Sequence, residues 1–302
     1  MLDSLWHSLL SWYAHNRRDL PWRRTRDPYA ILVSEAMLQQ TGVERVIAKY
    51  HAFLDSLPTL SSLAEAATAD VIRLWSGLGY NRRAVWLQRA ARVAIERWGR
   101  LPPSVEDLLS LPGIGAYTAR AVACFAFGAQ VAICDTNVRR VLSRLLRAAD
   151  TRPAAETEML ALAQSLLPPG RAYDWNQALM DLGATICTHS APRCPLCPVR
   201  TLCKAFPMTG TAGRSPAPVV GETRPRWKEA PFAGSRRYYR GRIVEALRRL
   251  RPGEGMIISE LGAQLKPGFA DGDVPWLIGL LLELAADGLV QMPREGAVRL
   301  PQ

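Results

Sequence analysis

The sequence predicts a mainly α-helical protein in two parts, a large all-helical domain and a small α+β domain at the C-terminal end. Apolar residues recur at helical spacing in about ten segments before residue 205, and none of these favours a strand. Four cysteines crowd into residues 187–203. A stretch rich in Gly, Pro, Ser, Thr and Arg then separates the last part of the chain. We therefore expect domains at 1–206 and 236–302, joined by a linker at 207–235.

The composition favours a soluble protein that binds a polyanion. The chain has 302 residues, 48% of them hydrophobic, and a net charge of +11 carried mostly by arginine. Such a surplus favours a nucleic-acid partner, with a generally basic solvated surface as the alternative. No apolar run reaches the length of a membrane span, and the N-terminus lacks the order of a signal peptide. We expect a cytoplasmic monomer, near the nucleoid and without membrane contact.

An acidic residue lies inside an apolar helix near the N-terminus. Residues 1–18 predict an amphipathic helix, and Asp27-Pro28 starts a second helix in which Glu35 is embedded. A buried carboxylate is costly unless it is paired, and burial raises the pKa of a carboxyl group toward that of a proton donor. A solvent-facing Glu35 is the alternative. The helix ends in a polar cluster that either contacts base edges or caps the helix, Gln39, Gln40 and Thr41.

Helical periodicity continues along the chain. Helices are expected at residues 43–58, 61–75, 85–98, 117–127, 156–167 and 175–186, with others starting at Pro103 and after Asp135. A Gly-rich break at 77–84 carries Tyr80, with Arg82 and Arg83 beside it. This tyrosine either inserts between bases while the arginines hold phosphates or is an ordinary surface residue.

The stretch from Leu111 to Arg144 combines a Gly-rich turn with a carboxylate. Gly113 and Gly115 allow close approach of backbone N–H groups to a phosphate, because a helix begins immediately after them. Asp135 lies where the N-cap of the next helix is expected. An ordinary helical corner and a simple cap are the alternatives. Together the two features favour chemistry on a nucleic acid.

The cysteines fall into two groups. Cys124 and Cys134 lie in apolar segments and are expected to be core thiols. The other four follow the spacing Cys-x6-Cys-x2-Cys-x5-Cys, at Cys187, Cys194, Cys197 and Cys203. In an intracellular chain such density favours metal over disulfides. The spacing contains a single Cys-x2-Cys pair, with short segments to the cysteine on either side. This pattern favours a four-iron four-sulfur cluster, with zinc as the alternative.

The C-terminal residues predict three helices followed by a hairpin. The helices are expected at 238–250, 258–265 and 275–284, and the hairpin strands at 289–292 and 297–300. This order resembles a winged-helix domain, which often binds DNA through its third helix. The third helix here is mostly Leu and Ile, so contact with a protein partner or a structural role is at least as well supported.

Several motifs carry a resemblance to a known family. The cysteine spacing, LPGIGAYTARA and the aspartate of CDTNVRRV resemble the helix-hairpin-helix superfamily of DNA base-excision glycosylases, in the iron–sulfur branch with endonuclease III. LPWRRTRDPYAILVSEAMLQQT, GLGYNRRA and WNQALMDLGATIC resemble the MutY-type adenine DNA glycosylases. The resemblance covers residues 18–205. It implies a two-lobed helical fold, a four-iron four-sulfur cluster, and double-stranded DNA with a mismatch or lesion as the partner.

The resemblance also implies roles for individual residues. Glu35 corresponds to the general acid that protonates the leaving adenine, and Asp135 to the carboxylate that stabilises the charged sugar and assists the attack of water. Tyr117 and Asn137 correspond to residues that support this site. The expected base pocket and DNA contacts comprise the pocket residues Trp22 and Arg23, the helix-end residues Leu38 and Thr41, Gln40 as the residue inserted into the duplex near the opposing base, the wedge Tyr80 beside it, and the phosphate-gripping Gly113 and Gly115. The cluster would present Arg193, Arg200 and Lys204 to the DNA backbone.

These roles agree with the chemistry of base excision. Cleavage of an N-glycosidic bond needs one group to protonate the leaving base and another to offset charge on the sugar, after the base is flipped out. The endonuclease III branch has a lysine at position 117 that forms a Schiff base, and a tyrosine does not form one. We therefore expect a monofunctional hydrolase that leaves an abasic site.

Three functions are consistent with the sequence, and they differ in substrate and in chemistry. Adenine opposite guanine or 8-oxoguanine is the expected target. A glycosylase for thymine or uracil opposite guanine is the nearest enzyme alternative, since Tyr117 and RTRDPY also resemble that branch. A catalytically silent iron–sulfur DNA-binding protein is the non-enzyme alternative. Residues 236–302 are too short for the MutT-like domain that inspects 8-oxoguanine in this family.

Overall fold

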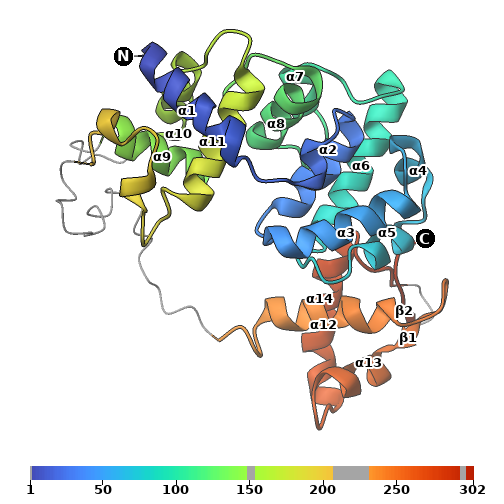
Figure 1. Cartoon of the computed structure of the whole chain (residues 1–302). Helices are drawn as coiled ribbons and strands as arrows, with labels where there is room; N and C mark the ends of the chain where they lie inside the picture. The colour runs from blue at the N-terminus through green and yellow to red at the C-terminus, as the bar shows by residue number, and fades with distance from the viewer. Residues whose placement is uncertain (1, 148–153, 207–230, 293–296) are drawn as a thin grey trace. The chain divides into compact units, whose positions relative to one another are not determined.

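The computed structural model describes residues 2–147, 154–206, 231–292 and 297–302. Helices dominate these parts of the chain (Figure 1). The chain divides into two compact units, and each is interleaved in sequence. The first unit comprises Met1–Pro28, Pro103–Val105 and Gly115–Trp227, and the second comprises Tyr29–Pro102, Glu106–Ile114 and Lys228–Gln302.

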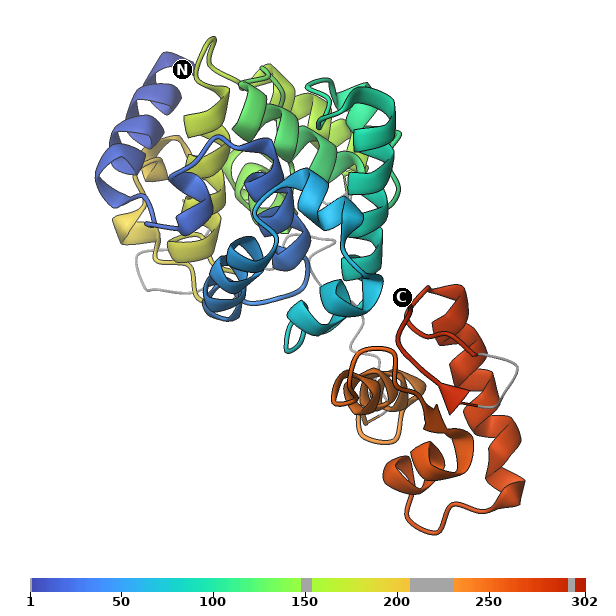
Figure 2. The same ribbon diagram turned by 90° about the vertical axis from the view of Figure 1, so that its right-hand side faces the viewer.

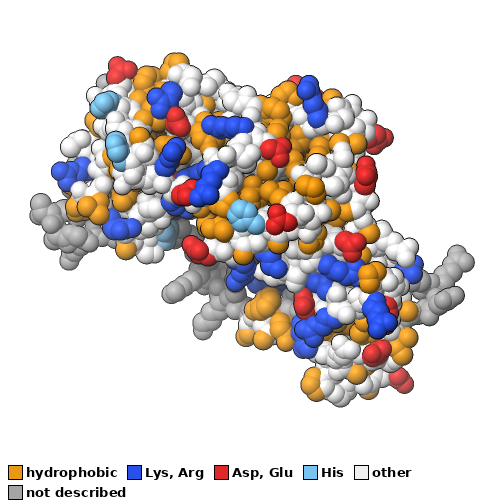
Figure 3. Space-filling model, turned by 45° about the vertical axis from the view of Figure 1, so that its right-hand side comes forward, with side chains coloured by type: hydrophobic (Ala, Val, Ile, Leu, Met, Phe, Trp, Pro, Cys, Tyr) orange, Lys and Arg blue, Asp and Glu red, His pale blue; other side chains and the backbone are white. Residues whose placement is uncertain are grey.

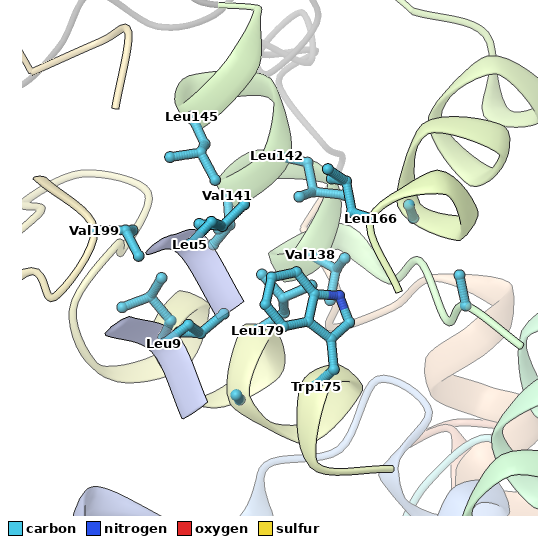
Figure 4. Packing of buried hydrophobic residues seen from close by; sticks show 14 of the residues in the cluster. Leu5, Leu9, Val138, Val141, Leu142, Leu145, Leu166, Trp175, Leu179 and Val199 are labelled. Atoms are coloured by element: carbon cyan, nitrogen blue, oxygen red, sulfur yellow. The ribbon is translucent and has the colours of Figure 1, made fainter. Parts of the chain in front are cut away.

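The first unit is built around α11. Its elements are α1 (Leu2–Asn16), η1 (Pro21–Arg23), α8 (Ala116–Phe127), α9 (Thr136–Leu146), α10 (Glu156–Ser165), α11 (Ala172–Thr185), η2 (Cys194–Leu196) and η3 (Arg200–Leu202). Trp175 of α11 is fully buried among Leu5 and Leu9 of α1 and Val138 and Leu142 of α9 (Figure 4). Large apolar side chains of this kind each contribute about 1.5–3 kcal/mol when fully buried. This core fixes the start of α9 against α11.

The second unit contains the apolar helix predicted around Glu35 and the C-terminal elements. Its first elements are α2 (Pro28–Leu38), α3 (Val43–Ser56), α4 (Leu60–Glu65), α5 (Thr68–Leu74), α6 (Arg82–Trp98) and α7 (Val105–Leu109). The sequence predicts one helix over 61–75, whereas the structure has two. The break between α4 and α5 is stabilised by a side chain of α6. Gln88 Nε2 donates hydrogen bonds to the backbone oxygens of Leu63 and Ala66, at 3.1 and 2.7 Å.

The C-terminal elements agree with the predicted winged-helix order and add one strand. They are α12 (Arg236–Arg248), β1 (Met256–Ile257), α13 (Ile258–Leu265), η5 (Asp271–Asp273), α14 (Val274–Ala286) and β2 (Ala297–Val298), which Figure 2 shows in orange and red. β1, which the sequence pattern missed, pairs antiparallel with β2. The predicted hairpin is present as the antiparallel bridge between Gln291 and Arg299, and its turn lies outside the described residues.

The C-terminal elements share a core with α5 and α6. Ile72 of α5 and Val85 of α6 pack with Leu247, Leu280 and Leu284. Arg248 of α12 donates to the Ile72 oxygen and to Asn81 Oδ1, at 3.0 and 2.8 Å. The predicted linker at 207–235 lies mostly outside the described residues, and the predicted domain boundaries stay predictions.

Two surface properties bear on the partners. None of the helices among the described residues is long and apolar enough to cross a membrane. Lys and Arg side chains are spread over the face that Figure 3 displays, interspersed with carboxylates, and the chain as a whole carries a net charge of +11. This distribution suits contact with an extended polyanion.

Candidate active site

The N-terminus of α9 holds a carboxylate in a fixed orientation. Asp135 is the N-cap, and its Oδ1 accepts a hydrogen bond from the Val138 backbone N–H at 2.6 Å. Asn137 Nδ2 donates to the other oxygen, Oδ2, at 3.2 Å. Arg140 Nη2 in turn donates to Asn137 Oδ1 at 2.8 Å. Asp135 and Asn137, which the sequence predicts to act together, are therefore in contact, and the half-buried Asp135 carboxylate is held through both oxygens.

A glycine missed by the sequence reasoning allows this arrangement. A Cβ on Gly183 of α11 would lie 2.7 Å from the Asn137 Cβ, which is too close for any side chain. Arg140 also donates to the oxygens of Gly183 and Cys187, both at 2.8 Å. The close approach of α11 to α9 thus ties the Asp135 region to the start of the four-cysteine loop. The sequence signal was a glycine inside an otherwise good helix, where glycine costs stability.

We expect Gly183→Ala to destabilise the protein by about 1–3 kcal/mol, because a methyl group is forced into a packed contact. The displacement of Asn137 should also slow base excision. Gly279→Ala is the matched control, since the Cβ there meets nothing within 4 Å and alanine favours the helix. Thermal unfolding and single-turnover excision measure both effects. A Gly183→Ala variant as stable and active as wild type would refute the packing argument.

Glu35 is buried in the middle of α2. Its exposed fraction is 5%, and all residues from Tyr29 to Met37 are buried. The solvent-facing alternative for Glu35 is therefore wrong. Glu35 belongs to the second unit and Asp135 to the first. Their joint action on one nucleotide stays a prediction.

Arg83 fixes the two predicted DNA-contacting turns to each other. Gln40 and Tyr80 both have left-handed backbone conformations, with φ values of 56° and 45°, which are strained for non-glycine residues. The Arg83 guanidinium donates to acceptors on both turns and on the end of α2, the oxygens of Ala36, Met37, Gln39, Leu78 and Gly79 and Thr41 Oγ1. Burial lowers the pKa of Arg83 to about 10. The donors of the Arg83 guanidinium are thus used mainly by main-chain carbonyls. The predicted phosphate contact fits Arg82 better, because Arg82 is exposed.

We expect Arg83→Lys to lower the free energy of unfolding by about 1–3 kcal/mol, since a lysine cannot satisfy six acceptors in two directions. The strained turns should relax, and affinity for duplex DNA should fall. Arg45→Lys, at an exposed position of α3 in the same unit, is the control. Chemical denaturation and duplex titration report the two effects. Equal stability of the two variants would show that Arg83 does not hold the turns.

Of the two predicted base-pocket residues of η1, Trp22 is buried and Arg23 is part of an ion-pair network. Trp22 is buried, with an exposed fraction of 7%. Arg23 forms two hydrogen bonds to the buried Asp181 of α11, at 2.7 and 2.9 Å, and Arg18 adds a third at 2.6 Å. Burial opposes ionisation of Asp181, but these arginines outweigh it and hold the pKa of its carboxyl below the ordinary value. The structure assigns Arg23 a positioning contact, and its place in a base pocket stays a prediction.

The Gly-rich turn has one position that only glycine can occupy. Gly113 has a φ of 75°, and a Cβ there would lie 2.7 Å from the Trp86 Cβ. Gly115 is the N-cap of α8, with open space around it, and Tyr117 is the second residue of that helix. The turn therefore precedes a helix N-terminus as predicted. Leu38 is the last residue of α2, and Thr41 lies in the turn that follows, where its Oγ1 accepts a hydrogen bond from Arg83.

The four clustered cysteines surround one cavity. Cys187, Cys194, Cys197 and Cys203 all line it, together with the largely buried Arg144. Burial raises the pKa of the Cys197 thiol to about 12, and it raises those of Cys194 and Cys203 as well. Buried thiolates therefore need a bound cation, which suits metal ligation. Cys124 is buried as expected, and Cys134 is half-buried.

Arg144 is the second residue that sequence reasoning missed. Its Nη1 donates to the Thr188 oxygen at 2.7 Å and lies 3.5 Å from Cys187 Sγ. Its Nη2 donates to the His189 oxygen at 3.0 Å. No three His, Cys, Asp or Glu side chains of the described residues are grouped as they would be around a single metal ion. The donor set instead encloses a cavity next to a fixed guanidinium.

Comparison with known proteins gives the class to which this helical fold belongs, the base excision DNA repair proteins. Residues 33–169 match the family model of the HhH-GPD superfamily of base excision DNA repair proteins. The chain is 41% identical to the adenine DNA glycosylase of Mycolicibacterium smegmatis, over 97% of this chain and 94% of that one. It is 46% identical to the adenine DNA glycosylase of Homo sapiens, over 66% of this chain and 38% of the human one.

Solved structures agree on the fold. A thermostable thymine-DNA glycosylase is 33% identical, with a TM-score of 0.64 over 68% of this chain and 96% of that one. A trapped endonuclease III–DNA covalent intermediate is 21% identical, with a TM-score of 0.58 over 68% of this chain and 96% of that one. The chain belongs to the adenine DNA glycosylase family, within the helix-hairpin-helix base-excision proteins. It is a DNA N-glycosylase, a hydrolase of N-glycosyl bonds.

Proposed function

We propose that the chain removes adenine mispaired with guanine or 8-oxoguanine from double-stranded DNA and leaves an abasic site. The observation that carries this proposal is the 41% identity to an adenine DNA glycosylase over 97% of the chain. The enzyme acts as a monomer in the cytoplasm, on DNA of the nucleoid.

Two carboxyl groups divide the chemistry. Glu35, shielded in α2, donates a proton to the adenine ring so that the base leaves as a neutral molecule. Asp135 stabilises the positive charge that develops on the sugar and assists the attack of water. Its orientation is supported by the hydrogen bonds from Val138 and Asn137. Both groups would act on a nucleotide that has left the base stack.

Strand cleavage through a covalent intermediate is not expected. A Schiff base needs an amine, whereas position 117 holds a tyrosine at the start of α8. Borohydride trapping during turnover should therefore give no efficient enzyme–DNA adduct. An adduct mapped to a lysine of this chain would contradict the monofunctional mechanism.

The four-cysteine loop is proposed to hold a four-iron four-sulfur cluster. The four side chains around one cavity and the adjacent Arg144 fit a polynuclear anionic centre, and zinc is the alternative. When bound, the cluster supplies a rigid scaffold for the loop that carries Arg193, Arg200 and Lys204. Iron, sulfide and zinc analysis of the purified protein distinguishes the two.

The base preference is tested with a panel of duplexes under single-turnover conditions. The panel contains A:8-oxoguanine, A:G, T:G and U:G pairs. We expect fastest release from the two adenine-containing pairs. A second candidate, thymine or uracil opposite guanine, is kept in the panel because the chain is 33% identical to a thymine-DNA glycosylase. Release of thymine or uracil alone would establish that candidate instead.

A further inference from the structure

The second unit contains a cavity of about 690 Å³ that no role proposed so far uses. It is lined by the turn after α2, the loop before α6 and the C-terminal helices α12 and α14. Its volume lies within the range of about 300–1,000 Å³ typical of small-molecule pockets. We call it the α6–α12 cavity. It adjoins Gln40 and Tyr80, the residues expected to enter the duplex.

Aromatic side chains give the α6–α12 cavity surfaces on which a base can stack. Tyr80 is 48% exposed and Phe232 is 55% exposed, although both are large and apolar. Trp86, also on the lining, is half-buried, with the Arg82 Cζ 5.2 Å from its ring centroid. Exposed aromatic faces beside guanidinium groups are the usual means of binding an unstacked base.

The cations around the cavity are not all neutralised. Arg240 is paired with Glu283 and Asp287. Arg237, in contrast, is exposed, has no ion pair within the described parts of the chain, and places its Cζ 5.0 Å from the Phe232 ring centroid. It lies in the first turn of α12, where a positive charge opposes the helix dipole. A cation held at such a position suits an anionic ligand.

The placement of α12 beside these turns is built into the packing. Arg248 bonds α12 to α5 and to Asn81. A Cβ on Gly288 would lie 2.7 Å from Arg89 Nη2 and 3.2 Å from Val85 Cγ1, so the end of α14 approaches α6 closely. α14 itself contributes Leu277, Leu280, Leu281 and Leu284 to the core. The positively charged side chains that the C-terminal elements contribute to the cavity therefore come from the first helix, α12, and not from the third, α14.

We propose that the α6–α12 cavity binds one nucleotide of the DNA strand that runs past Gln40 and Tyr80. The base lies against Phe232 and Tyr80, and Arg237 of α12 pairs with its phosphate. This inference rests on the proposed function for the nature of the DNA, and it gives the C-terminal elements a direct role in DNA binding.

The test compares two exposed arginines of the same segment. Arg237→Gln removes the cation of the cavity. Arg249→Gln is the matched control, since its side chain is 78% exposed and it is not among the residues lining the cavity. Each full-length variant is titrated, by fluorescence anisotropy at several salt concentrations, with a duplex that carries an uncleavable adenosine analogue. We expect Arg237→Gln to bind the duplex about tenfold more weakly. The slope of the logarithm of the binding constant against the logarithm of the salt concentration should fall by about one unit, because one phosphate contact is lost. The control should keep the wild-type slope.

A fluorescent base analogue reports the stacking. 2-Aminopurine is placed at successive positions of the strand opposite the adenine analogue. We expect strong quenching at one position, and Phe232→Ser, an exposed substitution, should reduce it. Equal slopes for Arg237→Gln and Arg249→Gln, or no position with Phe232-dependent quenching, would overturn the proposal. Excision by Arg249→Gln at saturating enzyme should stay within about twofold of wild type, since Arg249 does not line the cavity. Failure of wild-type excision with these binding results intact would instead count against the proposed function alone.

Discussion

Glu35→Gln is expected to abolish most base excision while the protein stays folded and bound to duplex DNA. Glutamine has nearly the shape of glutamic acid but cannot donate the proton that adenine needs to leave. General acids typically contribute about 10²–10⁴-fold to a rate, so a loss of at least about a hundredfold is expected under single-turnover conditions. Because Glu35 is 5% exposed inside α2, a neutral isostere should not disturb the packing.

The control for Glu35 is Glu65→Gln, an exposed position on α4 of the same unit. It should excise at the wild-type rate. Thermal unfolding and duplex affinity are measured for both variants, so that a loss of fold or binding is recognised. Excision by Glu35→Gln within about fivefold of wild type, at equal binding, would remove Glu35 from the chemistry.

Arg144→Met is expected to cost the protein the proposed iron–sulfur cluster and much of its stability. The guanidinium satisfies the oxygens of Thr188 and His189, and it lies beside Cys187 Sγ. Methionine leaves two carbonyls of the cysteine loop unpaired, at about 1–3 kcal/mol each, and it removes the cation next to Cys187, a proposed ligand of the cluster. We expect iron content to fall severalfold and the melting temperature to fall with it.

Arg171→Met is the matched substitution for Arg144. Arg171 is a 55% exposed residue of the same unit whose ion pair with Asp174 is local. Such surface pairs contribute about 0–1 kcal/mol, so iron content and melting temperature should be close to wild type. Iron and sulfide assays on both proteins, purified side by side, provide the comparison. Full iron occupancy in Arg144→Met would mean that the loop holds its metal without this arginine.

Periodicity and caps predicted most elements of the fold. Asp135 as the N-cap of α9 and the bounds of α13 follow directly from the local sequence. The missed features depend on tertiary contacts. The break between α4 and α5 is stabilised by Gln88, which lies more than twenty residues away, and β1 is two residues long and exists only through pairing with β2.

The residues expected to carry the chemistry of the candidate site could be named from the sequence, whereas the residues that hold them in place could not. Carboxylates and clustered cysteines are conspicuous in a sequence because their chemistry is rare in apolar surroundings. Gly183 and Arg144 were missed, and Arg83 was predicted to hold a phosphate, because glycines and arginines are common and only neighbours distant in sequence reveal their structural roles. The position of α12 beside Tyr80 could not be predicted for the same reason, since no local sequence pattern encodes that packing.

The most direct measurement is single-turnover excision of adenine by Asp135→Asn from an A:8-oxoguanine duplex. Asparagine caps a helix about as well as aspartate, so the hydrogen bond from Val138 and the start of α9 should survive. The negative charge is lost, and with it the hydrogen bond that Asn137 Nδ2 donates to Oδ2, because an amide nitrogen cannot accept it. We predict normal folding and duplex affinity with excision slowed by about a hundredfold or more, as when transition-state charge loses its partner. Excision at the wild-type rate by folded, DNA-bound Asp135→Asn would contradict a hydrolysis that depends on this carboxylate.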